Sequence, residues 1–376
     1  MCIRDRLVQG YKEGGILPKW PLASSYTGCM VGYPAVSVLA DLVAKDLAEG
    51  DMSTWAEAGA RSSVYREDLA EKFKGTRELD LITMHPYYKE KYGFVPADSV
   101  PESVSWGLEM AYEDWCISQI AKKAGNMELA NEYAKKAEYY KRYLDPETKM
   151  MRPVMGDGSF RTPFNPRYSS HMKSDYTEGN AFQWSFFAPH DMDNFIAAIG
   201  GKKELETRLD TLFTTSSQID GAEASGDITG LIGQYAHGNE PSHHMAYLYN
   251  WTDSPWKGQE YLDYIMQNFY TNEPDGIIGN EDCGQMSAWY VMSALGFYQV
   301  SPGIPVYTLG RPMVNKASMH VKGGIFEIVA TNNSPANKYV KEVKLNGKVL
   351  ETPFISHSDI INGGKLEFIM TDQPVK

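Results

Sequence analysis

The sequence predicts a mainly α-helical protein that ends in a smaller antiparallel β region. Between residues 34 and 295, apolar residues recur at helical spacing in about ten segments, which are joined alternately by short and long connections. After Gly296, short apolar or alternating runs lie between Gly, Asn and Pro turns, and Asn346-Gly347 is typical of a hairpin. Because successive helices read as antiparallel pairs, we expect an (α/α)6 toroid whose functional loops gather at one end.

The expected elements follow from these periodicities and from the breaking residues between them. Residues 10–32, 75–101 and 145–174 are expected to be loops, because they are rich in Gly, Pro and polar side chains. The expected helices are residues 34–47, 54–73, 103–123, 128–143, 178–187, 192–199, 202–213, 242–251, 254–270 and 283–295. The expected strands are residues 307–309, 319–321, 326–329, 340–345 and 366–370.

This reading divides the chain into three regions. Residues 8–299 are expected to form the helical barrel, and residues 300–376 the antiparallel β segment. A ring of six helix pairs needs about two more helices at the front, so the first helices of the toroid are expected to be missing. We interpret residues 1–7 as a non-native scar of cloning or sequence assembly, because the sequence becomes coherent only near Val8.

Composition limits the classes of partner. The formal net charge of −12 argues against nucleic acid or an anionic membrane as partner. The 8 Trp, 24 Tyr and 14 Phe suit sugar binding and equally suit an ordinary core. Four scattered cysteines form neither a disulfide framework nor a metal motif. No apolar run is long enough to span a membrane, and residues 1–7 lack the apolar centre of a signal peptide.

Residues 276–282 place two glycines and two acids just ahead of an apolar helical run. Asp282 stands three residues before Gln285, the spacing of a capping box, which makes it a candidate N-cap of the following helix. A carboxylate there meets free N–H groups and the positive end of the helix dipole, which keep it ionised. Asp282 therefore suits a general base. The alternative is a residue that only caps the helix.

Residues 176–191 place Glu178 beside Gly179 among many aromatic residues. An acid against aromatic walls has its charged form disfavoured, so it can hold a proton near neutrality and act as a general acid. The alternative is a first-turn Glu that stabilises the start of a helix. A protonated acid facing an ionised one is typical of glycoside hydrolysis. Glu178 and Asp282 are distant in the sequence, so their meeting depends on the toroid.

Residues 237–244 hold three His and one Glu, which invites a zinc site made of His237, Glu240, His243 and His244. The HExxH spacing is absent, however, and Pro241 makes Asn239 and Glu240 helix-entry groups. Asn, Glu and backbone oxygens suit calcium better than zinc. A hydrogen-bonded structural turn is the third interpretation of this segment.

Several of these motifs carry a resemblance to a known family. Residues 14–20, 26–32, 176–191, 233–244 and 279–298 strongly resemble glycoside hydrolase family 92, the calcium-dependent exo-acting α-mannosidases. The resemblance runs in order from about residue 10 to the C-terminus. It implies an N-terminal β-sandwich, a helical linker, an (α/α)6 barrel and a β tail. This chain resembles the barrel and tail only, so we expect the β-sandwich of its parent chain to be missing.

The resemblance also implies an inverting mechanism and roles for individual residues. Glu178 matches the general acid and Asp282 the general base. Asn280 occupies a possible helper position, where some members carry a second acid. Calcium is expected near Asn239, Glu240 and Asp282.

The substrate-binding candidates are Trp20, Glu223, His237 and Gln285. Trp20 could equally line the core, and Gln285 could only partner a cap. Glu223 resembles a leaving-sugar contact of members that cleave α-1,2 links. Those members tend to carry His just before it, where this chain has Ala222. The resemblance therefore favours α-1,2 links only slightly.

The leading hypothesis is an exo-acting, inverting, Ca²⁺-dependent α-mannosidase that acts on α-mannoside glycans, as in the degradation of N-glycans. Its parent is expected to be secreted, periplasmic or anchored in an outer membrane. Two alternatives remain. One is a zinc-dependent hydrolase built on the histidine cluster, and the other is a carbohydrate-binding toroid that has lost its activity.

Overall fold

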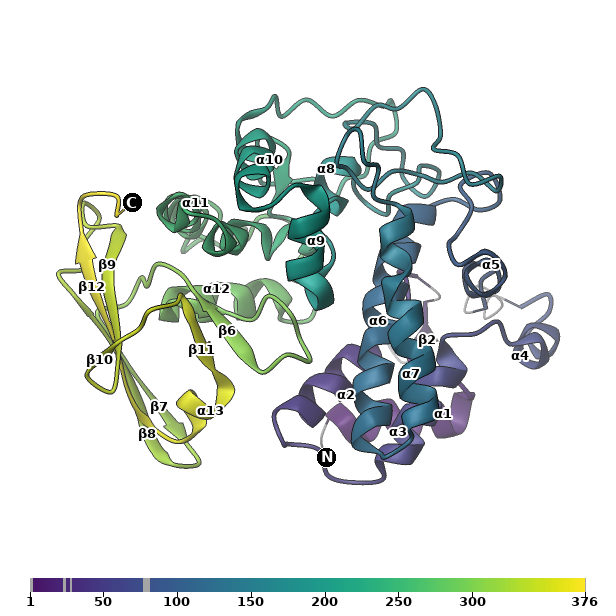
Figure 1. The fold of residues 1–376 in the computed structure, drawn as a ribbon, viewed down its shortest axis with the longest axis horizontal. Coiled ribbons are helices and arrows are strands. Elements are labelled where there is room, and N and C mark those ends of the chain that lie inside the picture. The colour runs from purple at the N-terminus through teal and green to yellow at the C-terminus, as the bar shows by residue number, and fades with distance from the viewer. Residues whose placement is uncertain (1–2, 23–24, 28, 77–81, 376) are drawn as a thin grey trace. The chain divides into compact units, whose positions relative to one another are not determined.

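The structure is a computed structural model that describes residues 3–22, 25–27, 29–76 and 82–375 (Figure 1). The chain forms two compact units. The first contains the residues up to Asp191 together with Ile219–Ser225 and Pro302–Ile304, and the second contains Met192–Gln218, Gly226–Ser301 and the chain from Pro305 onward. This division differs from the boundary expected near residue 299. Residues 1–2 of the expected scar and residue 28 of the 26–32 motif lie outside the described residues.

The first unit is mainly helical. In the described part of the chain its elements are α1 (Ile3–Gly14), β1 (Pro21–Leu22), β2 (Ser25–Tyr26), α2 (Ala35–Ala44), α3 (Met52–Ser62), α4 (Glu67–Lys72), α5 (His85–Tyr92), α6 (Ser103–Lys123), α7 (Met127–Lys136), η2 (Ala137–Arg142), α8 (Ala181–Trp184) and η3 (Pro189–Asp191).

Helix α6 is the centre of this unit. Helices α2, α3 and α7 pack against it (Figure 1), and most of its residues are buried on all sides. Its buried residues lie all round the helix rather than on one stripe, which is typical of a helix surrounded by neighbours. A short turn follows it, and the Asn126 side chain caps α7 by accepting from the Leu129 N–H at 3.1 Å. The expected pairing of these two helices is confirmed.

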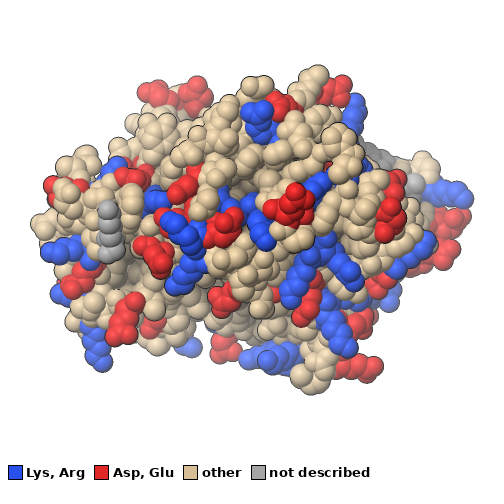
Figure 2. Space-filling view, turned by 45° about the horizontal axis from the view of Figure 1, so that its top comes forward, with Lys and Arg blue, Asp and Glu red and all other residues tan. Residues whose placement is uncertain are grey.

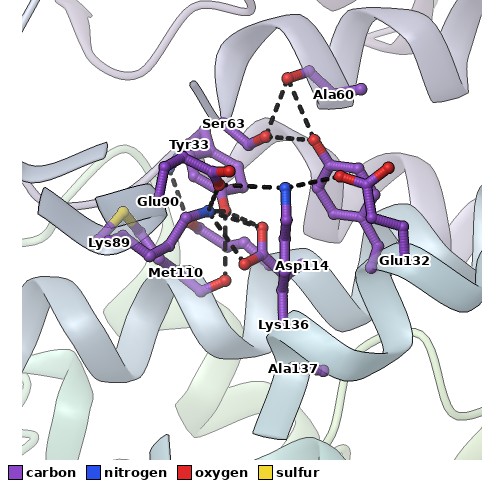
Figure 3. Close-up of polar contacts among 12 residues, drawn as sticks. Tyr33, Ala60, Ser63, Lys89, Glu90, Met110, Asp114, Glu132, Lys136 and Ala137 are labelled. Atoms are coloured by element: carbon purple, nitrogen blue, oxygen red, sulfur yellow. Dashed lines mark hydrogen bonds and ion pairs between the residues drawn. The ribbon is translucent and has the colours of Figure 1, made fainter. Parts of the chain in front are cut away.

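A buried network of ionic groups lies beside α6 (Figure 3). Asp114 is fully buried, and the Lys89 ammonium donates to its two oxygens at 3.1 and 3.0 Å. The Tyr33 hydroxyl also donates to Asp114. Lys136 lies nearby and pairs with Glu90 at 3.0 Å and Glu132 at 2.8 Å. Each charge in the network therefore has a partner of opposite sign.

Three expectations for this unit were wrong. The loop expected over residues 75–101 contains α5, which has Pro86 in its first turn and ends at Gly93 in the left-handed conformation (φ 74°). The loop expected from residue 10 begins inside α1. The helix expected over residues 54–73 is two helices, because the chain leaves helical geometry after Ser63 and is extended at Arg66.

The described residues of the second unit form helices and three sheets. Its described elements are α9 (Met192–Ile199), α10 (Lys202–Thr214), β3 (Leu231–Ile232), β4 (Tyr235–Ala236), η4 (Glu240–Ser242), η5 (Met245–Trp251), α11 (Pro255–Asn268), α12 (Gln285–Leu295), β5 (Phe297–Tyr298), β6 (Val306–Leu309), β7 (Lys316–Val321), β8 (Gly324–Thr331), β9 (Tyr339–Leu345), β10 (Lys348–Val349), β11 (Phe354–Ser356), α13 (His357–Ile361) and β12 (Gly364–Thr371). The helix expected over residues 242–251 is 3₁₀ rather than α.

The larger sheet has the strand order β10-β9-β12-β8-β7. Its inner face is apolar, with Phe326, Ile328 and Phe368 fully buried. Its pairs are antiparallel except that β12 runs parallel to β8, with Leu366 opposite Ile328. The expected antiparallel region is therefore mixed at one pair. Helix α13 lies in the long connection from β8 to β12, and a parallel pair requires such a crossover.

Ion pairs form on the strands of this sheet. Lys316 pairs with Glu327 at 2.8 Å, and Lys365 pairs with Glu367 at 2.7 Å. More widely, basic and acidic side chains are interspersed over the face of the molecule that Figure 2 displays. Within the described residues, no helix combines the length and the apolarity that crossing a bilayer requires.

Candidate active site

The residues expected to form the site fall into two groups. Trp20, Glu178 and Glu223 belong to the first unit. The second unit holds His237, Asn239, Glu240, Asn280, Asp282 and Gln285. Each group has its own geometry within its unit.

Glu178 occupies a special position in the backbone. It is half-buried and has a φ of +47°, in the left-handed region that non-glycine residues seldom adopt. Helix α8 begins just after it, at a capping box in which the Asn180 side chain accepts from Phe182 N–H and Gln183 accepts from Asn180 N–H. The helix expected from residue 178 therefore starts at Ala181, and Glu178 belongs to the turn before it.

The other two candidates of the first unit differ in exposure. Trp20 is half-buried, and its backbone carbonyl accepts from the Thr27 hydroxyl at 2.7 Å. Glu223 is exposed and pairs with Lys173 at 2.7 Å. The hydrogen bond and the positive charge of Lys173 lower the pKa of Glu223. Glu223 is thus an ionised, accessible carboxylate.

A hollow in the first unit was not anticipated from the sequence. Its walls include Lys19, Tyr33, Tyr65, Arg66 and Trp106. Lys19 donates to the Met30 carbonyl at 3.1 Å, and its ammonium lies 4.7 Å from the centre of the Trp106 ring. Burial lowers the pKa of Lys19 to about 8. The signal that could have pointed to it is Lys19 next to Trp20 in an otherwise apolar stretch.

In the second unit, His237 is completely buried and bonded on both ring nitrogens. The Tyr235 hydroxyl lies 2.7 Å from its Nδ1, and the Tyr270 hydroxyl lies 2.7 Å from its Nε2. The ring also meets Trp289 edge to face at 4.5 Å. Burial and the neighbouring His243 hold the pKa of His237 well below its usual value. This geometry favours a neutral structural histidine, whereas the sequence analysis predicted that His237 contacts the substrate.

The same holds for His243, which weakens the zinc interpretation. Its Nε2 lies 3.0 Å from the His237 carbonyl, and its Nδ1 lies 3.2 Å from the Gln285 amide nitrogen. A zinc ligand needs a ring nitrogen lone pair directed at the metal. Across the described residues, no three His, Cys, Asp or Glu side chains converge as a metal cage would. Gln285 thereby contacts a histidine and does not act as a partner in a helix cap.

Glu240 and Asp282 form the most unusual contact of this unit. Their carboxyl groups are hydrogen-bonded to each other, and Asp227 lies nearby. Burial raises the pKa of Glu240 to about 7, and the charge of Asp282 and their hydrogen bond add to this effect. The environment of Glu240 therefore favours its protonated form. The sequence analysis placed Glu240 and Asp282 together as candidate calcium ligands. It did not predict their direct contact or the presence of Asp227 beside them.

Asp282 does not cap α12, and the expectation that it does was wrong. The cap position is Gly284 (φ 103°), without a side-chain hydrogen bond of its own. The carboxylate of Glu281 accepts instead from the N–H groups of Gly284 and Ser287. Asp282 has a φ of +50° and is exposed. The preceding acid therefore serves the helix and leaves Asp282 available for chemistry.

Two asparagines flank the acid pair. Asn239 is buried, and its side-chain oxygen accepts from Glu240 N–H at 3.1 Å, which caps η4. Asn280 is exposed, and its amide lies 3.3 Å from a carboxylate oxygen of Asp227. The donors around Glu240 and Asp282 are therefore carboxylate and amide oxygens. This donor chemistry fits a hard cation such as Ca²⁺ better than zinc.

Comparison with known proteins places the fold in a class of helical glycoside hydrolases. The family model described as "Glycosyl hydrolase family 92 catalytic domain" matches residues 3–372. The chain therefore belongs to glycosyl hydrolase family 92 and corresponds to its catalytic domain. The expected family and fold class, mainly helical with a smaller, mostly antiparallel β region, are confirmed.

Two solved structures of Bacteroides thetaiotaomicron are similar to this chain. A family 92 α-mannosidase in complex with mannoimidazole shares 38% identity at a TM-score of 0.88, over 99% of this chain and 48% of that protein. A family 92 inverting mannosidase shares 31% identity at a TM-score of 0.84, over 99% of this chain and 50% of that protein.

A curated relative from Arthroderma benhamiae is described as an uncharacterized secreted glycosidase. It is 23% identical over 97% of this chain and 48% of its own length. The chain thus spans about half the length of the relatives that it matches.

Proposed function

We propose that the protein is the catalytic part of an exo-acting α-mannosidase that releases terminal mannose from α-linked glycans. The observation that carries this proposal is the likeness to an α-mannosidase solved with mannoimidazole, at 38% identity. The backbone supports it as well. Glu178 and Asp282, the two proposed catalytic acids, both have a positive φ, of 47° and 50°. Residues held in such sparsely populated conformations cluster at active sites.

The proposed reaction is a single displacement with inversion. A water oxygen forms a bond to the anomeric carbon while Asp282 accepts a proton from that water. The bond from the anomeric carbon to the leaving oxygen breaks, and Glu178 donates its proton to that oxygen. The products are β-mannose and the shortened glycan, and solvent returns each acid to its starting state. A similar protein is described as an inverting mannosidase, which supports this course.

Glu240 is not the partner acid in this proposal. A water must fit between the two carboxyl groups of an inverting pair, which places them about 6.5–9.5 Å apart. Glu240 and Asp282 are hydrogen-bonded and lie too close for that. Their proximity instead suits ligands of a shared cation. We propose that Glu240 and Asp282, with Asn239, hold Ca²⁺, which would supply a fixed positive charge for sugar hydroxyl groups.

Linkage and location are further parts of the proposal. The accessible, ionised Glu223 is proposed to contact the leaving sugar of α-1,2-linked substrates. The parent protein is proposed to be secreted, periplasmic or anchored in an outer membrane, and to carry a β-sandwich before this chain. The secreted description of the curated relative and the half-length coverage support these points.

The test measures mannose release from a panel of α-linked mannobioses by this chain and by its full-length parent. Glu178→Gln and Asp282→Asn are each expected to lower kcat by about 10²–10⁴-fold, the usual contribution of general acid–base catalysis. Glu147→Gln and Asp275→Asn are matched controls, because both residues are exposed and lie outside the proposed site. NMR of fresh product is expected to show β-mannose first.

Each other outcome has a defined meaning. A near-normal rate in either variant removes that residue from the mechanism, and initial α-mannose contradicts inversion. Chelation with EDTA should abolish turnover, and Ca²⁺ should restore it. Restoration by zinc alone would support the zinc hydrolase. Mannoside binding without mannose release by the parent would support an inactive binding toroid.

A further inference from the structure

The segment that precedes Glu178 is hydrogen-bonded to the start of α6. We propose that Ser105 is a positioning residue for Glu178, an inference that rests on the proposed role of Glu178 as general acid. Ser105 lies 73 positions before Glu178 in the sequence. Its hydroxyl oxygen accepts from the N–H group of Thr177, the residue just before Glu178, at 2.8 Å. Ser105 is completely buried and Thr177 nearly so, so water does not compete for this bond.

A second side chain holds the same residue from its other end. The indole Nε1 of Trp184 donates to the Thr177 carbonyl at 2.9 Å. Trp184 belongs to α8 and is 2% exposed, so it comes from a different element than Ser105. The two backbone polar groups of Thr177 are thus fixed by two buried side chains. The peptide plane that enters Glu178 has its direction set by this arrangement.

The attachment continues upstream along the chain. Helix α6 has no side-chain cap at its start. Its free N–H groups are satisfied by the distant segment instead, because Glu102 N–H donates to Ser174 O at 2.7 Å and Val104 N–H donates to Asp175 O at 3.0 Å. The Ser103 hydroxyl adds a hydrogen bond to the Asp175 carboxylate at 3.1 Å. The N-terminal turn of α6 therefore serves as a platform for residues 174–177.

This platform explains how Glu178 keeps an unfavourable backbone conformation. A non-glycine residue with φ near +47° persists only where its surroundings over-determine it. Of the fixed groups nearby, the Trp184 indole holds the carbonyl of the peptide that joins Thr177 to Glu178, and the Ser105 hydroxyl holds the N–H of the peptide just before it. Loss of either would let the carboxyl group shift. A misplacement of about 1 Å can cost about a hundredfold in rate.

The test uses the dependence of the rate on the leaving group. A poor leaving group needs the proton of Glu178, whereas an activated aryl group departs without it. In the full-length parent, Ser105→Ala is expected to lower kcat by about 10–100-fold on a mannobiose and by less than about threefold on a dinitrophenyl mannoside. KM should change little, because Ser105 does not contact the substrate in this proposal.

Ser118→Ala is the matched control. Ser118 lies on the same helix, is buried, and donates its hydroxyl to the Ala130 carbonyl at 2.9 Å. The Ser118→Ala substitution removes one buried hydroxyl hydrogen bond far along α6 from Ser105. Any change in rate should therefore be equal for both substrates. Trp184→Phe keeps the aromatic bulk and removes only the indole donor. It should reproduce the leaving-group pattern of Ser105→Ala, and it remains informative if Ser105→Ala does not fold.

The outcomes separate this inference from the proposed function. If the wild-type parent releases no mannose, the proposed function fails. If Glu178→Gln shows the leaving-group pattern and both Ser105→Ala and Trp184→Phe do not, only the positioning role is overturned. Equal rate losses on both substrates in both variants would likewise overturn it, because they would indicate a general structural effect.

Discussion

Asp114 is fully buried and Glu240 partly buried, and the surroundings of these two acids are opposite. Asp114, on α6, faces the ammonium of Lys89 at 3.0 Å and the hydroxyl of Tyr33 (Figure 3). Glu240, in η4, faces the carboxyl group of Asp282. The first acid faces a partner of opposite charge, and the second faces another acid.

The difference separates structural charge from functional charge. Burial raises the pKa of Asp114, and the attraction of Lys89 offsets only part of that effect. Such pairs are needed once they are buried, because removal of one partner leaves the other uncompensated. A like-charged pair such as Glu240 and Asp282 adds no stability of its own. It persists in proteins where it serves chemistry or holds a cation.

The largest stability effect is expected at Lys89. Lys89→Met should leave Asp114 as an uncompensated buried acid and lower the free energy of unfolding by about 3–5 kcal/mol, as measured by urea denaturation. Lys74→Met is the control, because Lys74 and Glu71 form an exposed pair at 3.6 Å. That change should stay within about 1 kcal/mol. Equal effects of the two variants would contradict the structural role of the buried pair.

A smaller effect is expected at Glu113. This buried acid has other acids nearby, as Glu240 has, and also a lysine, as Asp114 has. Burial raises the pKa of Glu113 well above its usual value, and the charges of Glu109 and Asp114 add to it, whereas Tyr33 N–H and Lys19 oppose it. The Tyr33 N–H donates to Glu113 Oε2 at 2.7 Å. Since the folded state holds the proton more tightly than the unfolded state, stability is full below the unfolded pKa and decreases as the pH rises toward the folded one.

Glu113→Gln should remove this pH dependence. The amide keeps an acceptor for Tyr33 N–H and cannot ionise. The variant should therefore match the wild type near pH 4 and exceed it by about 1–3 kcal/mol near pH 8, the usual cost of a poorly compensated buried polar group. Urea denaturation at both pH values measures the difference. A constant offset between the two proteins at all pH values would show that Glu113 does not titrate between these states.

Much of the helical framework could be predicted from local sequence. The bounds of α6 and α9 were predicted to the residue, because each is an apolar helical run between clear breaks. Helix α5 was missed although Pro86 and Gly93 marked its ends. The parallel pairing of β8 and β12 was missed because strand direction depends on the whole connection through α13 and leaves no local pattern.

The candidate site was predictable as a set of residues but not as a set of contacts. The motifs around Glu178 and Asp282 stand out in the sequence by their acids, glycines and aromatic residues. The hydroxyl groups that occupy His237 come from Tyr235 and Tyr270, and the second lies 33 positions away. Long-range hydrogen bonds of this kind decide whether a histidine is a ligand or a structural residue.

The smallest expected effect distinguishes the two adjacent acids before α12. Spacing alone made Asp282 the cap, because Asp282 and Gln285 fit a capping box. The fold instead places Asp282 and Cys283 in consecutive left-handed conformations (φ 50° and 56°), which turns Glu281 toward the helix N–H groups. Hydrogen bonds with Ser287 and Gly284 lower the pKa of Glu281. Sequence spacing cannot reveal such a backbone turn.

Glu281→Ala should therefore lower the melting temperature slightly. The difference from the wild type should disappear at acidic pH, because the Glu281 carboxylate of the wild type is then protonated and no longer accepts these hydrogen bonds. Asp282→Asn should leave the melting temperature unchanged in calcium-free buffer, because its carboxyl group supports no helix, while it lowers kcat by about 10²–10⁴-fold when Ca²⁺ is present. A scanning calorimetry series at several pH values measures both. If Asp282→Asn destabilises the protein and Glu281→Ala does not, the cap belongs to Asp282, and the separation of structural from functional charge fails at this helix.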